Sequence, residues 1–563
     1  MFADDERRIA TRETELGPPL REAADRSVPR PFDPPPAVGE IPEPYRYFSD
    51  LVSSHILHAL EVRPAYALPE PTPLEVWRRN LEIVTALLSA IGVDCFAVPG
   101  FGLTRPVVGV ADADRRRVIA ALAVLCDSTG GRLTAAEPPR LESAPVGTPV
   151  RPRTDLGDVT VVRADWLWTE PTRNLVFGAE YGCEVEFWTE DGGGRLVAPR
   201  RNRISQVVRR DSAPVAAPGR LFTPLAAGSR AGLPTVATRP EFGATGPEEV
   251  GFPIDVVYTW VDGDDRAWLR RRAEAAESPY HAESANESRF IDREELRYSL
   301  RSLYLNAPWV RHVYLVTDAQ CPHWLDSDAP GVTVVDHREL FDDPECLPTF
   351  NSHAIETQLH RIDGLSEHFL YFNDDMFLGR PVAPRLFFEP GGLARFFPSD
   401  TFIDLDPVSA ADTPPNAAFK NDRSLLEHAF GRTITRMVQH VPYPLQRSVL
   451  AEVEKEFGDL HARTAGSVFR DISDISVVTL QHYYAFLTGR AVWGTSRHAY
   501  LELGRPDLAE RLAELLEGRD RETFCINDAG LTADLARERS TMLRSFLESY
   551  FPVPSPFERR AAP

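Results

Sequence analysis

Two adjacent carboxylates, Asp374 and Asp375, directly follow the apolar run HFLYF, whose aromatic and aliphatic residues predict a buried strand. Ligands of open α/β sheets bind at the carboxyl ends of the strands, so this pair lies where a substrate is expected. Carboxylate oxygens suit Mg²⁺ or Mn²⁺, and Mg²⁺ commonly bridges to the phosphates of a substrate. A solvated turn capped by Asn373 and Asp374 is the alternative explanation.

A second predicted strand, in the segment IDVVYTWVDGDD, offers a comparable arrangement. Asp255 lies near its start, whereas Trp260 and Asp262 lie at its end. An indole such as that of Trp260 can stack on a nucleobase. An Asp-Gly turn at Asp262 and a core position for Trp260 are the alternatives.

Two predicted helices add further polar candidates. On the helix predicted to begin at Asn351, His353, Glu356 and His360 recur at spacings of three and four residues and therefore share a face. Such a face could act as a general base or a metal site, or form a hydrogen-bonded cluster. On an earlier helix, Arg297 suits either a phosphate clamp or a solvated charged face.

Later segments contain isolated candidates. QHVPYPLQRSV contains His440 and Arg447, VFRDISD contains Arg470, and FCINDAG contains Asn527 and Asp528. A core histidine and an ordinary ion-pair arginine are the alternatives for His440 and Arg470. Each residue carries little weight alone, so the elements that could bring them together matter more.

The pattern from residue 251 onward predicts those elements. Four apolar segments predict strands, at residues 254–261, 311–318, 331–337 and 368–372. Two segments with helical spacing alternate with them, at residues 292–308 and 351–366, and the first opens with Asp292 and Glu295 in capping-box spacing. This alternation predicts an α/β domain with a doubly wound sheet. Helical segments dominate beyond about residue 415.

Composition predicts four parts of the chain. Residues 1–40 are charged and Pro-rich, which predicts a flexible leader. Residues 41–210 mix helical and strand patterns and predict a separate N-terminal α+β domain. Residues 211–250 are rich in Ala, Pro and Gly and predict a linker. Residues 251–563 then form the α/β domain with its helical C-terminal part.

The overall composition limits the classes of function. With 563 residues the chain is long enough for several domains, and its net charge of -21 disfavours nucleic acid as a partner. Its six cysteines form no CxxC pair, which is typical of reduced thiols. We find no run of about 18 apolar residues and no apolar signal core at the N-terminus. These features predict a cytoplasmic protein.

Taken together and in this order, the segments from about residue 251 to 560 resemble the Stealth family of sugar-phosphate transferases. The first conserved region of that family is similar to IDVVYTWVDGDD, and the second to the stretch from RFIDREEL to YFNDDMFLG. The third is similar to HVPYPLQRSVLAEVEKEF and the fourth to FCINDAG with the SYFPVPSPFE tail. The resemblance implies a nucleotide-sugar-binding, GT-A-like sheet in residues 251–563.

The resemblance also implies an activity and its partners. A sugar 1-phosphate would pass from a UDP-sugar to a hydroxyl of a growing capsular or extracellular polysaccharide, with release of UMP. The cofactor would be Mg²⁺ or Mn²⁺. Peripheral association with a polysaccharide-assembly complex at the inner face of the cell membrane is a further expectation. The alternatives are a conventional metal-dependent glycosyltransferase that releases UDP, or a non-catalytic polysaccharide assembly factor.

Carried over by position, the resemblance implies roles for particular residues. His440 would be the catalytic base, with Glu356 as the competing candidate, and Asp374 and Arg470 would also be catalytic. The implied substrate contacts are Asp255, Trp260, Asp262, Arg297, His353 and Arg447. The implied metal ligands are Asp374, Asp375, Asn527 and Asp528. Tyr443 stands where the animal branch of the family carries a second histidine, so the role of that histidine is not transferred.

Overall fold

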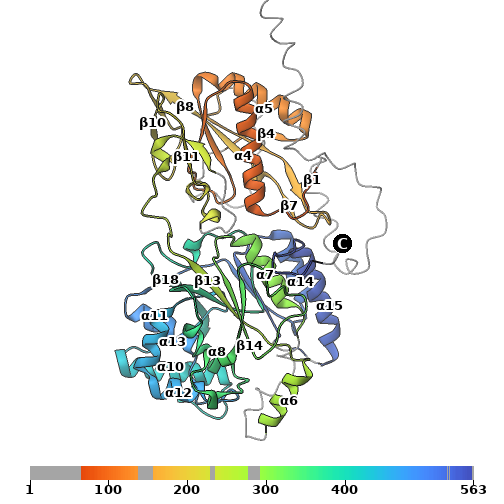
Figure 1. Ribbon diagram of the computed structural model, residues 1–563, viewed down its shortest axis with the longest axis vertical. Helices are drawn as coiled ribbons and strands as arrows, with labels where there is room; N and C mark the ends of the chain where they lie inside the picture. The colour runs from red at the N-terminus through yellow and green to blue at the C-terminus, as the bar shows by residue number, and fades with distance from the viewer. Residues whose placement is uncertain are drawn as a thin grey trace, which may run out of the picture. The chain divides into compact units, whose positions relative to one another are not determined.

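The computed structural model describes residues 65–136, 156, 158–227, 235–276, 292–528, 531 and 533–560 (Figure 1). These residues fall into two compact units, and the division lies between Gly246 and Pro247 for all of them except Ala227, which groups with the second unit. The predicted leader, residues 1–40, lies outside the described residues. Within the described part of the chain, no helix has both the length and the apolar character that a membrane span needs.

The N-terminal unit is built on one large sheet with two long helices, α4 (Pro73–Ala90) and α5 (Arg115–Thr129). Helix α4 begins after Thr72, whose hydroxyl accepts a hydrogen bond from the Glu75 amide at 3.1 Å. The strands of this sheet are β2 (Cys95–Ala97), β3 (Val107–Ala111), β4 (Arg132–Ala135), β5 (Val161–Asp165), β8 (Cys183–Glu190), β9 (Arg195–Val197), β10 (Val207–Arg209), β11 (Val215–Ala217) and β12 (Val236–Thr238). A small separate sheet contains β1 (Ala65–Ala67), β6 (Leu167–Thr169) and β7 (Val176–Phe177).

The prediction of a linker at residues 211–250 is wrong for the residues that the structure describes there. Strands β11 and β12 pair antiparallel, and β12 continues the sheet by pairing with β2. The Thr238 hydroxyl donates to the Ala97 carbonyl at 2.6 Å, and the Phe242 ring is fully buried 6.2 Å from that of Phe96. Strands of three residues are too short to produce a detectable alternation, so the small residues around them dominated the sequence pattern.

The C-terminal unit contains a five-stranded sheet in the order β15-β14-β13-β16-β21. Its strands are β13 (Ile254–Thr259), β14 (Val313–Thr317), β15 (Val332–Asp336), β16 (His368–Asn373) and β21 (Tyr443–Gln446). Strands β13 to β16 are mutually parallel, and β21 is antiparallel to β16. The chain adds β14 and β15 on one side of β13 and then β16 on the other, which confirms the doubly wound α/β prediction. The carboxyl ends of β13 and β16 therefore border the switch point where such sheets bind ligands.

Helices connect these parallel strands. Helix α7 (Glu295–Asn306) follows β13, and α9 (Ser352–Glu356) precedes β16. The helix predicted for residues 351–366 is much shorter than expected, since a 3-10 turn at Leu359–Arg361 replaces its second half. His353 and His360 consequently do not share a helix face, and the His360 ring pairs instead with Glu454.

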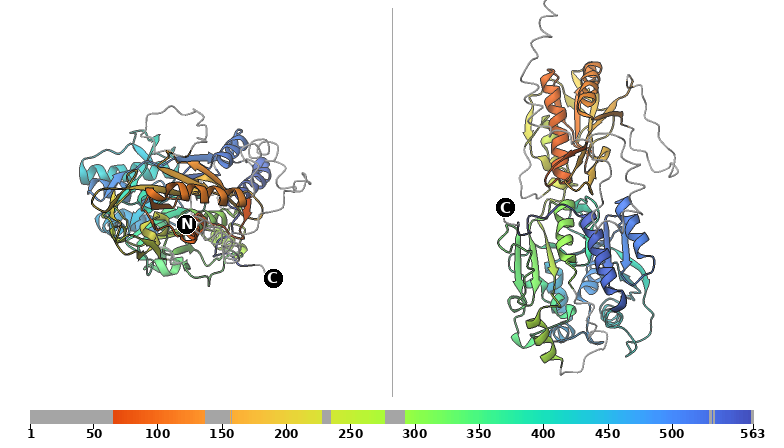
Figure 2. Two further views of the ribbon diagram at one scale, coloured as in Figure 1. Left: turned by 90° about the horizontal axis from the view of Figure 1, so that it is seen from above. Right: turned by 90° about the vertical axis from the view of Figure 1, so that its right-hand side faces the viewer.

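The C-terminal part is mainly helical, as predicted. Helices α10 (Pro414–Phe430), α11 (Arg447–Glu456), α12 (Gly458–Ala465) and α13 (Val477–Leu487) lie together in Figure 1, coloured cyan to blue. Helices α14 (Leu508–Gly518) and α15 (Ala533–Tyr550) follow. Figure 1 and the right-hand view of Figure 2 place α15, in dark blue, beside the green helix α7, and the Tyr298 hydroxyl of α7 donates to Glu548 of α15 at 3.3 Å.

A second, three-stranded sheet positions part of the site. It consists of β17 (Met376–Leu378), β24 (Thr523–Asn527) and β23 (His498–Glu502) in the order β17-β24-β23. Met376 pairs with Cys525 across the antiparallel strands β17 and β24. This register brings the end of the FCIN segment beside the acidic pair that precedes β17. Two further pairs, β18 (Ala394–Phe396) with β22 (Ala491–Trp493) and β19 (Pro398–Phe402) with β20 (Arg436–Val438), lie in the same unit.

Candidate active site

A cavity of about 1050 Å³ opens at the carboxyl ends of β13 and β16. Its wall includes Trp260 from the end of β13, Glu356 from α9 and Asp375 from the turn after β16. His440, which precedes β21, and Asn527 at the end of β24 complete the set. Residues from all four motif-bearing parts of the sequence therefore meet in one cavity.

The acidic pair lies on the cavity wall with two further carboxylates nearby. Burial raises the pKa of Asp374 well above its usual range, and the nearby charges of Glu295, Asp375 and Asp292 raise it further. Burial likewise raises the pKa of Glu295 to about 7. Mutually repelling carboxylates that are withdrawn from water are unfavourable by themselves, so this acidic group is suited to a cation.

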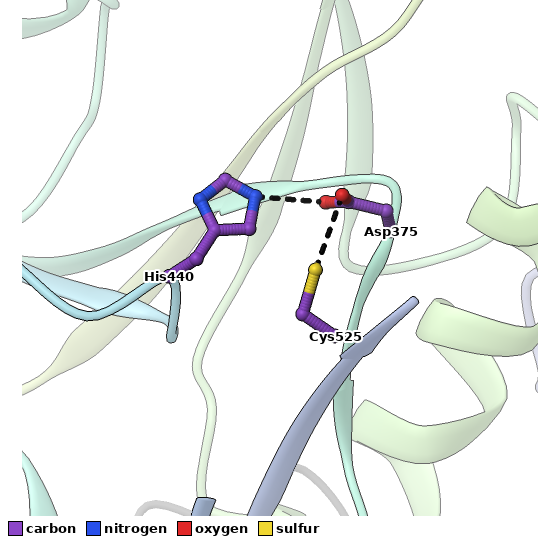
Figure 3. A group of neighbouring side chains, drawn as sticks. All are labelled: Asp375, His440 and Cys525. Atoms are coloured by element: carbon purple, nitrogen blue, oxygen red, sulfur yellow. Dashed lines mark hydrogen bonds and ion pairs between the residues drawn. The ribbon is translucent and has the colours of Figure 1, made fainter. Parts of the chain in front are cut away.

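Asp375 has a different environment, which Figure 3 shows. Its Oδ1 lies 3.2 Å from His440 Nε2, and its Oδ2 lies 3.2 Å from both Cys525 Sγ and Asn527 Nδ2. The Tyr443 hydroxyl lies 2.9 Å from His440 Nδ1, so both ring nitrogens have a partner. Asp375 and His440 thus form the centre of a hydrogen-bonded group.

The charges of Asp375 and His440 support each other. Burial by itself would lower the pKa of His440, but the Asp375 carboxylate outweighs this effect and the pKa is raised. Burial by itself would raise the pKa of Asp375, but the His440 imidazole and the Cys525 and Asn527 hydrogen bonds lower it below its usual value. The arrangement therefore favours an imidazolium next to a carboxylate.

The side chains of Asp375, His440 and Cys525 also bring one oxygen, one nitrogen and one sulfur within 4.8 Å of one another. This set of donor types is found in transition-metal sites. Burial and the Asp375 charge, however, raise the pKa of the Cys525 thiol well above its usual value. Without a metal the thiol therefore keeps its proton and donates a hydrogen bond to Asp375 Oδ2 at 3.2 Å, whereas a bound metal would deprotonate it.

The wall formed by α9 carries the other acid–base candidates. The Asn351 side chain accepts from the His353 amide at 3.0 Å and thereby caps the start of this short helix. Burial raises the pKa of Glu356, and the charges of His353 and Arg470 oppose that shift only in part. Arg470 Nη2 donates to the Ser352 hydroxyl at 2.6 Å. The structure thus places His353, Glu356 and Arg470 together at one side of the cavity wall.

The predicted metal ligands meet a simple test of fit. Asp528 lines the cavity, and its buried Oδ2 has no hydrogen-bond partner among the described residues. Asn527 and the acidic pair line the same cavity. Oxygen donors of this kind suit Mg²⁺ or Mn²⁺. Because both oxygens of Asp375 already have partners, Asp374 and Asp528 are the carboxylates with coordination capacity to spare.

Asp255 lies far from the cavity, contrary to the substrate contact that the family resemblance implied. It is fully buried near the amino end of β13, where its oxygens accept from Arg311 Nε and the Ser366 amide, both at 2.8 Å. At about 3.3 Å per residue, it lies ~16 Å along the strand from Trp260. Its role is to anchor a loop and an arginine at the opposite edge of the sheet.

Two predicted substrate-binding arginines also have structural partners. Arg297 Nε donates to Glu558 at 2.7 Å, and Arg447 Nε donates to the His360 carbonyl at 2.7 Å. Neither residue lines the cavity. The structure therefore corrects both assignments, because residue type alone did not distinguish an arginine with a partner inside the protein from a phosphate ligand.

Of the two predicted substrate-binding residues at the end of β13, Trp260 lines the cavity and Asp262 does not. Trp260 borders the cavity, but only 6% of it is exposed, and it belongs to the hydrophobic core. Asp262 does not line the cavity, and its Oδ1 accepts from the Asp264 amide at 2.9 Å in a local turn. The alternative interpretations, a core tryptophan and an Asp-Gly turn, therefore describe these residues better than direct nucleotide contacts.

Several residues that line the cavity had no role assigned from the sequence. Glu295 and Arg293 line the cavity near the start of α7, and Tyr443 and Tyr500 line it beside His440. The charged run DREE, residues 292–295, could have indicated Arg293 and Glu295, but the spacing of Asp292 and Glu295 predicts a capping box instead. In the structure, α7 starts after Glu294 in a left-handed conformation with φ of 66° and no side-chain cap, which leaves Glu295 turned toward the cavity.

The structural role of Arg297, an ion pair with Glu558, can be tested by comparing its alanine variant with that of the cavity residue Arg470. We expect Arg297→Ala to lower the free energy of unfolding of the C-terminal unit by about 1–2 kcal/mol, because Glu558 loses one of two charged partners. Arg470→Ala, the matched cavity variant, should instead weaken donor binding. Chemical unfolding curves and donor KM values measure the two effects. A raised donor KM in a stable Arg297→Ala protein would restore its role as a substrate ligand.

Comparisons with known proteins extend these observations. Family models described as Stealth protein conserved regions match residues 252–279 (region 1), 289–396 (region 2), 439–486 (region 3) and 513–563 (region 4). An exopolysaccharide phosphotransferase of Streptomyces coelicolor is 46% identical and aligns with 88% of this chain and 92% of its own length. A second one from that organism is 49% identical over 88% of this chain and 85% of the relative.

More distant similarities are also found. Exopolysaccharide phosphotransferase CpsY of Mycobacterium tuberculosis is 36% identical over 87% of this chain and 90% of the relative. Among solved structures, the galactosyltransferase LgtC in complex with donor and acceptor sugar analogues has a TM-score of 0.28 and 12% identity. That alignment covers 52% of this chain and 96% of LgtC. Mouse xyloside xylosyltransferase 1 has a TM-score of 0.24 and 9% identity, over 50% of this chain and 99% of that one.

Proposed function

This chain belongs to the Stealth protein family, and from that premise we propose that it transfers a sugar 1-phosphate from a UDP-sugar to a polysaccharide hydroxyl. Its relatives are exopolysaccharide phosphotransferases, and it is a transferase of that class. The acceptor would be a growing capsular or extracellular polysaccharide, the product a phosphodiester, and the leaving group UMP. The observation that carries this proposal is the single cavity that combines an acidic group, the His440–Asp375 pair and Arg470.

The His440–Asp375 pair supplies a base for the acceptor hydroxyl. With its hydrogen on Nε2, the ring donates to Asp375 Oδ1, which leaves Nδ1 as the proton-accepting atom. The Tyr443 hydroxyl lies 2.9 Å from Nδ1 and lines the cavity, so it would relay the proton: it gives its own hydrogen to Nδ1 while its oxygen takes the proton of the acceptor hydroxyl. When Nδ1 takes the proton, Asp375 stabilises the resulting imidazolium, as a carboxylate does in other histidine-based sites.

Glu356 is the competing base. It lines the same cavity, and the Tyr371 hydroxyl donates to its Oε1 at 3.3 Å. Burial raises its pKa, which makes the carboxylate a stronger base but also increases the fraction that holds a proton. His440 is preferred because Asp375 is directly hydrogen-bonded to it and can balance the charge that proton transfer creates.

The Arg470 guanidinium would bind the negatively charged donor. We assign the donor phosphates to Arg470, with His353 beside it on α9, because a guanidinium makes strong charge-assisted hydrogen bonds to phosphate oxygens. Asp374, Asn527 and Asp528 would hold Mg²⁺ or Mn²⁺, which when bound supplies charge stabilisation to phosphoryl oxygens and the departing nucleotide. Trp260 forms the apolar border of the cavity on the side of β13.

The released nucleotide distinguishes this proposal from its alternatives. We expect the purified protein, given a panel of UDP-sugars and a polysaccharide primer, to release UMP, measured by anion-exchange chromatography. Chelation with EDTA should abolish the release, and added Mg²⁺ or Mn²⁺ should restore it. Reactions without primer are the control for hydrolysis. Release of UDP would identify a conventional glycosyltransferase, and no donor consumption with any primer would favour a non-catalytic assembly factor.

A further inference from the structure

In the described part of the C-terminal unit, several large aromatic side chains on β19, β22, β23 and α13 are exposed to solvent. They are Phe402 (66% exposed), Trp493 (51%), Tyr500 (40%) and Phe486 (38%). Phe402 ends β19, Trp493 ends β22, Tyr500 lies in β23 and Phe486 lies near the end of α13. Single exposed apolar residues are ordinary, but a group of exposed rings on a folded unit indicates a binding surface.

An arginine joins the members of this group. The Arg436 guanidinium lies 5.7 Å from the centre of the Phe402 ring and 5.7 Å from that of Trp493. The Trp493 ring lies 5.8 Å from that of Phe486. Stacking on a cation and on one another holds exposed rings in fixed orientations. We call Phe402, Arg436, Phe486 and Trp493 the aromatic platform.

The platform is continuous with the wall of the cavity. Phe402 pairs with Arg436, and Pro398 with Val438, across β19 and β20. Between these positions, Ser399, Asp400 and Thr401 line the cavity. Arg436 Nη2 also donates to Asp400 at 3.0 Å, so a single ion pair links the platform to the cavity rim.

We propose that the aromatic platform binds the acceptor polysaccharide and guides it into the cavity, an inference that rests on the proposed transfer to a polysaccharide. Sugar rings present apolar C–H faces, which stack on aromatic rings, and hydroxyls around their edges, which need hydrogen-bond partners. The surface offers both kinds of partner. The rings of Phe402 and Trp493 are exposed, and the hydroxyl and carboxylate groups of Ser399, Asp400 and Thr401 lie next to them.

Other occupants fit this surface less well. The three platform rings present on the order of 300 Å² of apolar surface, below the ~800 Å² per partner of a standard protein interface. An anionic membrane is disfavoured because the chain carries a net charge of -21 and Asp400, whose side chain is fully exposed, lies at the platform. A polyhydroxylated glycan needs only single sugar rings to lie on the platform, and Arg436 offers a cation to a phosphodiester that a growing chain already carries.

The proposal predicts where substitutions act in the reaction. Trp493→Ala removes the largest ring, so we expect the KM for the polysaccharide primer to rise about tenfold, while the KM for the donor stays within twofold. Phe402→Ala should act in the same direction. Within the platform, the Phe402 ring interacts with Arg436 only. The Phe402→Ala variant therefore leaves the packing of Trp493 against Phe396 and Phe486 unchanged. Phe101→Ala is the matched control, since Phe101 is 65% exposed and belongs to the N-terminal unit.

Binding can be measured without any donor by affinity electrophoresis of the full chain in gels that contain dextran, hydroxyethylcellulose or mannan. We expect at least one of these polysaccharides to retard the wild type and the Phe101→Ala control. Trp493→Ala and Phe402→Ala should each lose about tenfold in apparent affinity. Thermal unfolding curves show that each variant is folded.

The outcomes separate this inference from the proposed function. If the platform variants reduce retardation but the protein releases no UMP, the result would support glycan binding by the platform and contradict the proposed reaction. Unchanged retardation in the Phe402→Ala, Trp493→Ala double variant would overturn the inference, and so would the absence of retardation of the wild type in all three gels. Trp493-dependent cosedimentation with phosphatidylglycerol vesicles, without retardation by any polysaccharide, would also overturn it and assign the surface to a membrane.

Discussion

Replacing His440 by alanine is expected to lower the rate of UMP release by about two to four orders of magnitude, the range found when a general base is removed. The expectation rests on the Asp375 carboxylate, which lies 3.2 Å from His440 Nε2 and can stabilise the protonated ring. Donor affinity should change little, because the phosphates are assigned to Arg470. Single-turnover rates and a separate measurement of donor binding distinguish these effects.

The competing candidate supplies the control. Glu356→Ala should impair the reaction less than His440→Ala does if the histidine is the base. A histidine variant with a near-normal rate, together with a severe loss in the glutamate variant, would transfer the role of base to Glu356. Both side chains line the same cavity, so the two variants sample the same environment.

The pH profile gives a further test of the His440–Asp375 pair. A base is active in its neutral form, so activity is lost as the pH falls through the pKa of His440. Since Asp375 outweighs burial and raises this pKa above 6.5, the acidic limb of the wild-type profile should lie above pH 6.5. In Asp375→Asn the supporting charge is absent, and the limb should move to lower pH while the maximal rate falls. If the acidic limb does not move in Asp375→Asn, the titration of His440 does not cause it.

Replacing Asp374 by asparagine is expected to lower turnover at least ~10³-fold, because its carboxylate is the proposed anchor for the divalent cation. The folded protein should be at least as stable as the wild type at neutral pH. In the wild type, burial and the charges of Glu295, Asp375 and Asp292 raise the pKa of Asp374. An acid with a raised pKa costs stability increasingly as the pH rises from its unfolded-state pKa of about 3.9 to its folded-state pKa, and the neutral amide removes this cost.

This variant also has a readout that does not depend on activity. Mn²⁺ should raise the melting temperature of the wild type, because a ligand that binds only the folded state stabilises it, and it should not raise that of Asp374→Asn. Asp262→Asn is the matched control, since Asp262 follows the neighbouring strand β13 but does not line the cavity. Equal Mn²⁺ stabilisation of wild type and Asp374→Asn would remove Asp374 from the metal site.

Much of the C-terminal unit could be predicted from local pattern. Alternating apolar strands and amphipathic helices predicted the doubly wound sheet, and the rule that ligands bind at strand carboxyl ends predicted the location of Asp374 and Asp375. The motifs also identified His440, Glu356, Arg470, Asn527 and Asp528, all of which line the cavity. The sheet and the place of its acidic pair were predictable because strand periodicity and strand ends are properties of contiguous residues, whereas the family resemblance selected the other five residues.

Predictions failed where a side chain had several chemically equivalent partners to choose from. Asp255 and Arg297 have the residue types of a binding site, but Arg311 and Glu558 satisfy them within the protein. The strands of the supposed linker were missed because a strand of three residues contains too few alternations to identify it. Residue type states what a group can bind, whereas the partner depends on which segments fold against it.

The pairing of Asp375 with His440 and Asn527 illustrates that dependence. These residues are 65 and 152 positions apart in the chain, and no local pattern relates them. The antiparallel register of β17 with β24 places Met376 opposite Cys525, and the pairing of β16 with β21 places Tyr443 opposite Tyr371. Because a shift of one residue in either register would turn the side chains to the other face of the sheet, packing of the whole unit selects the site geometry.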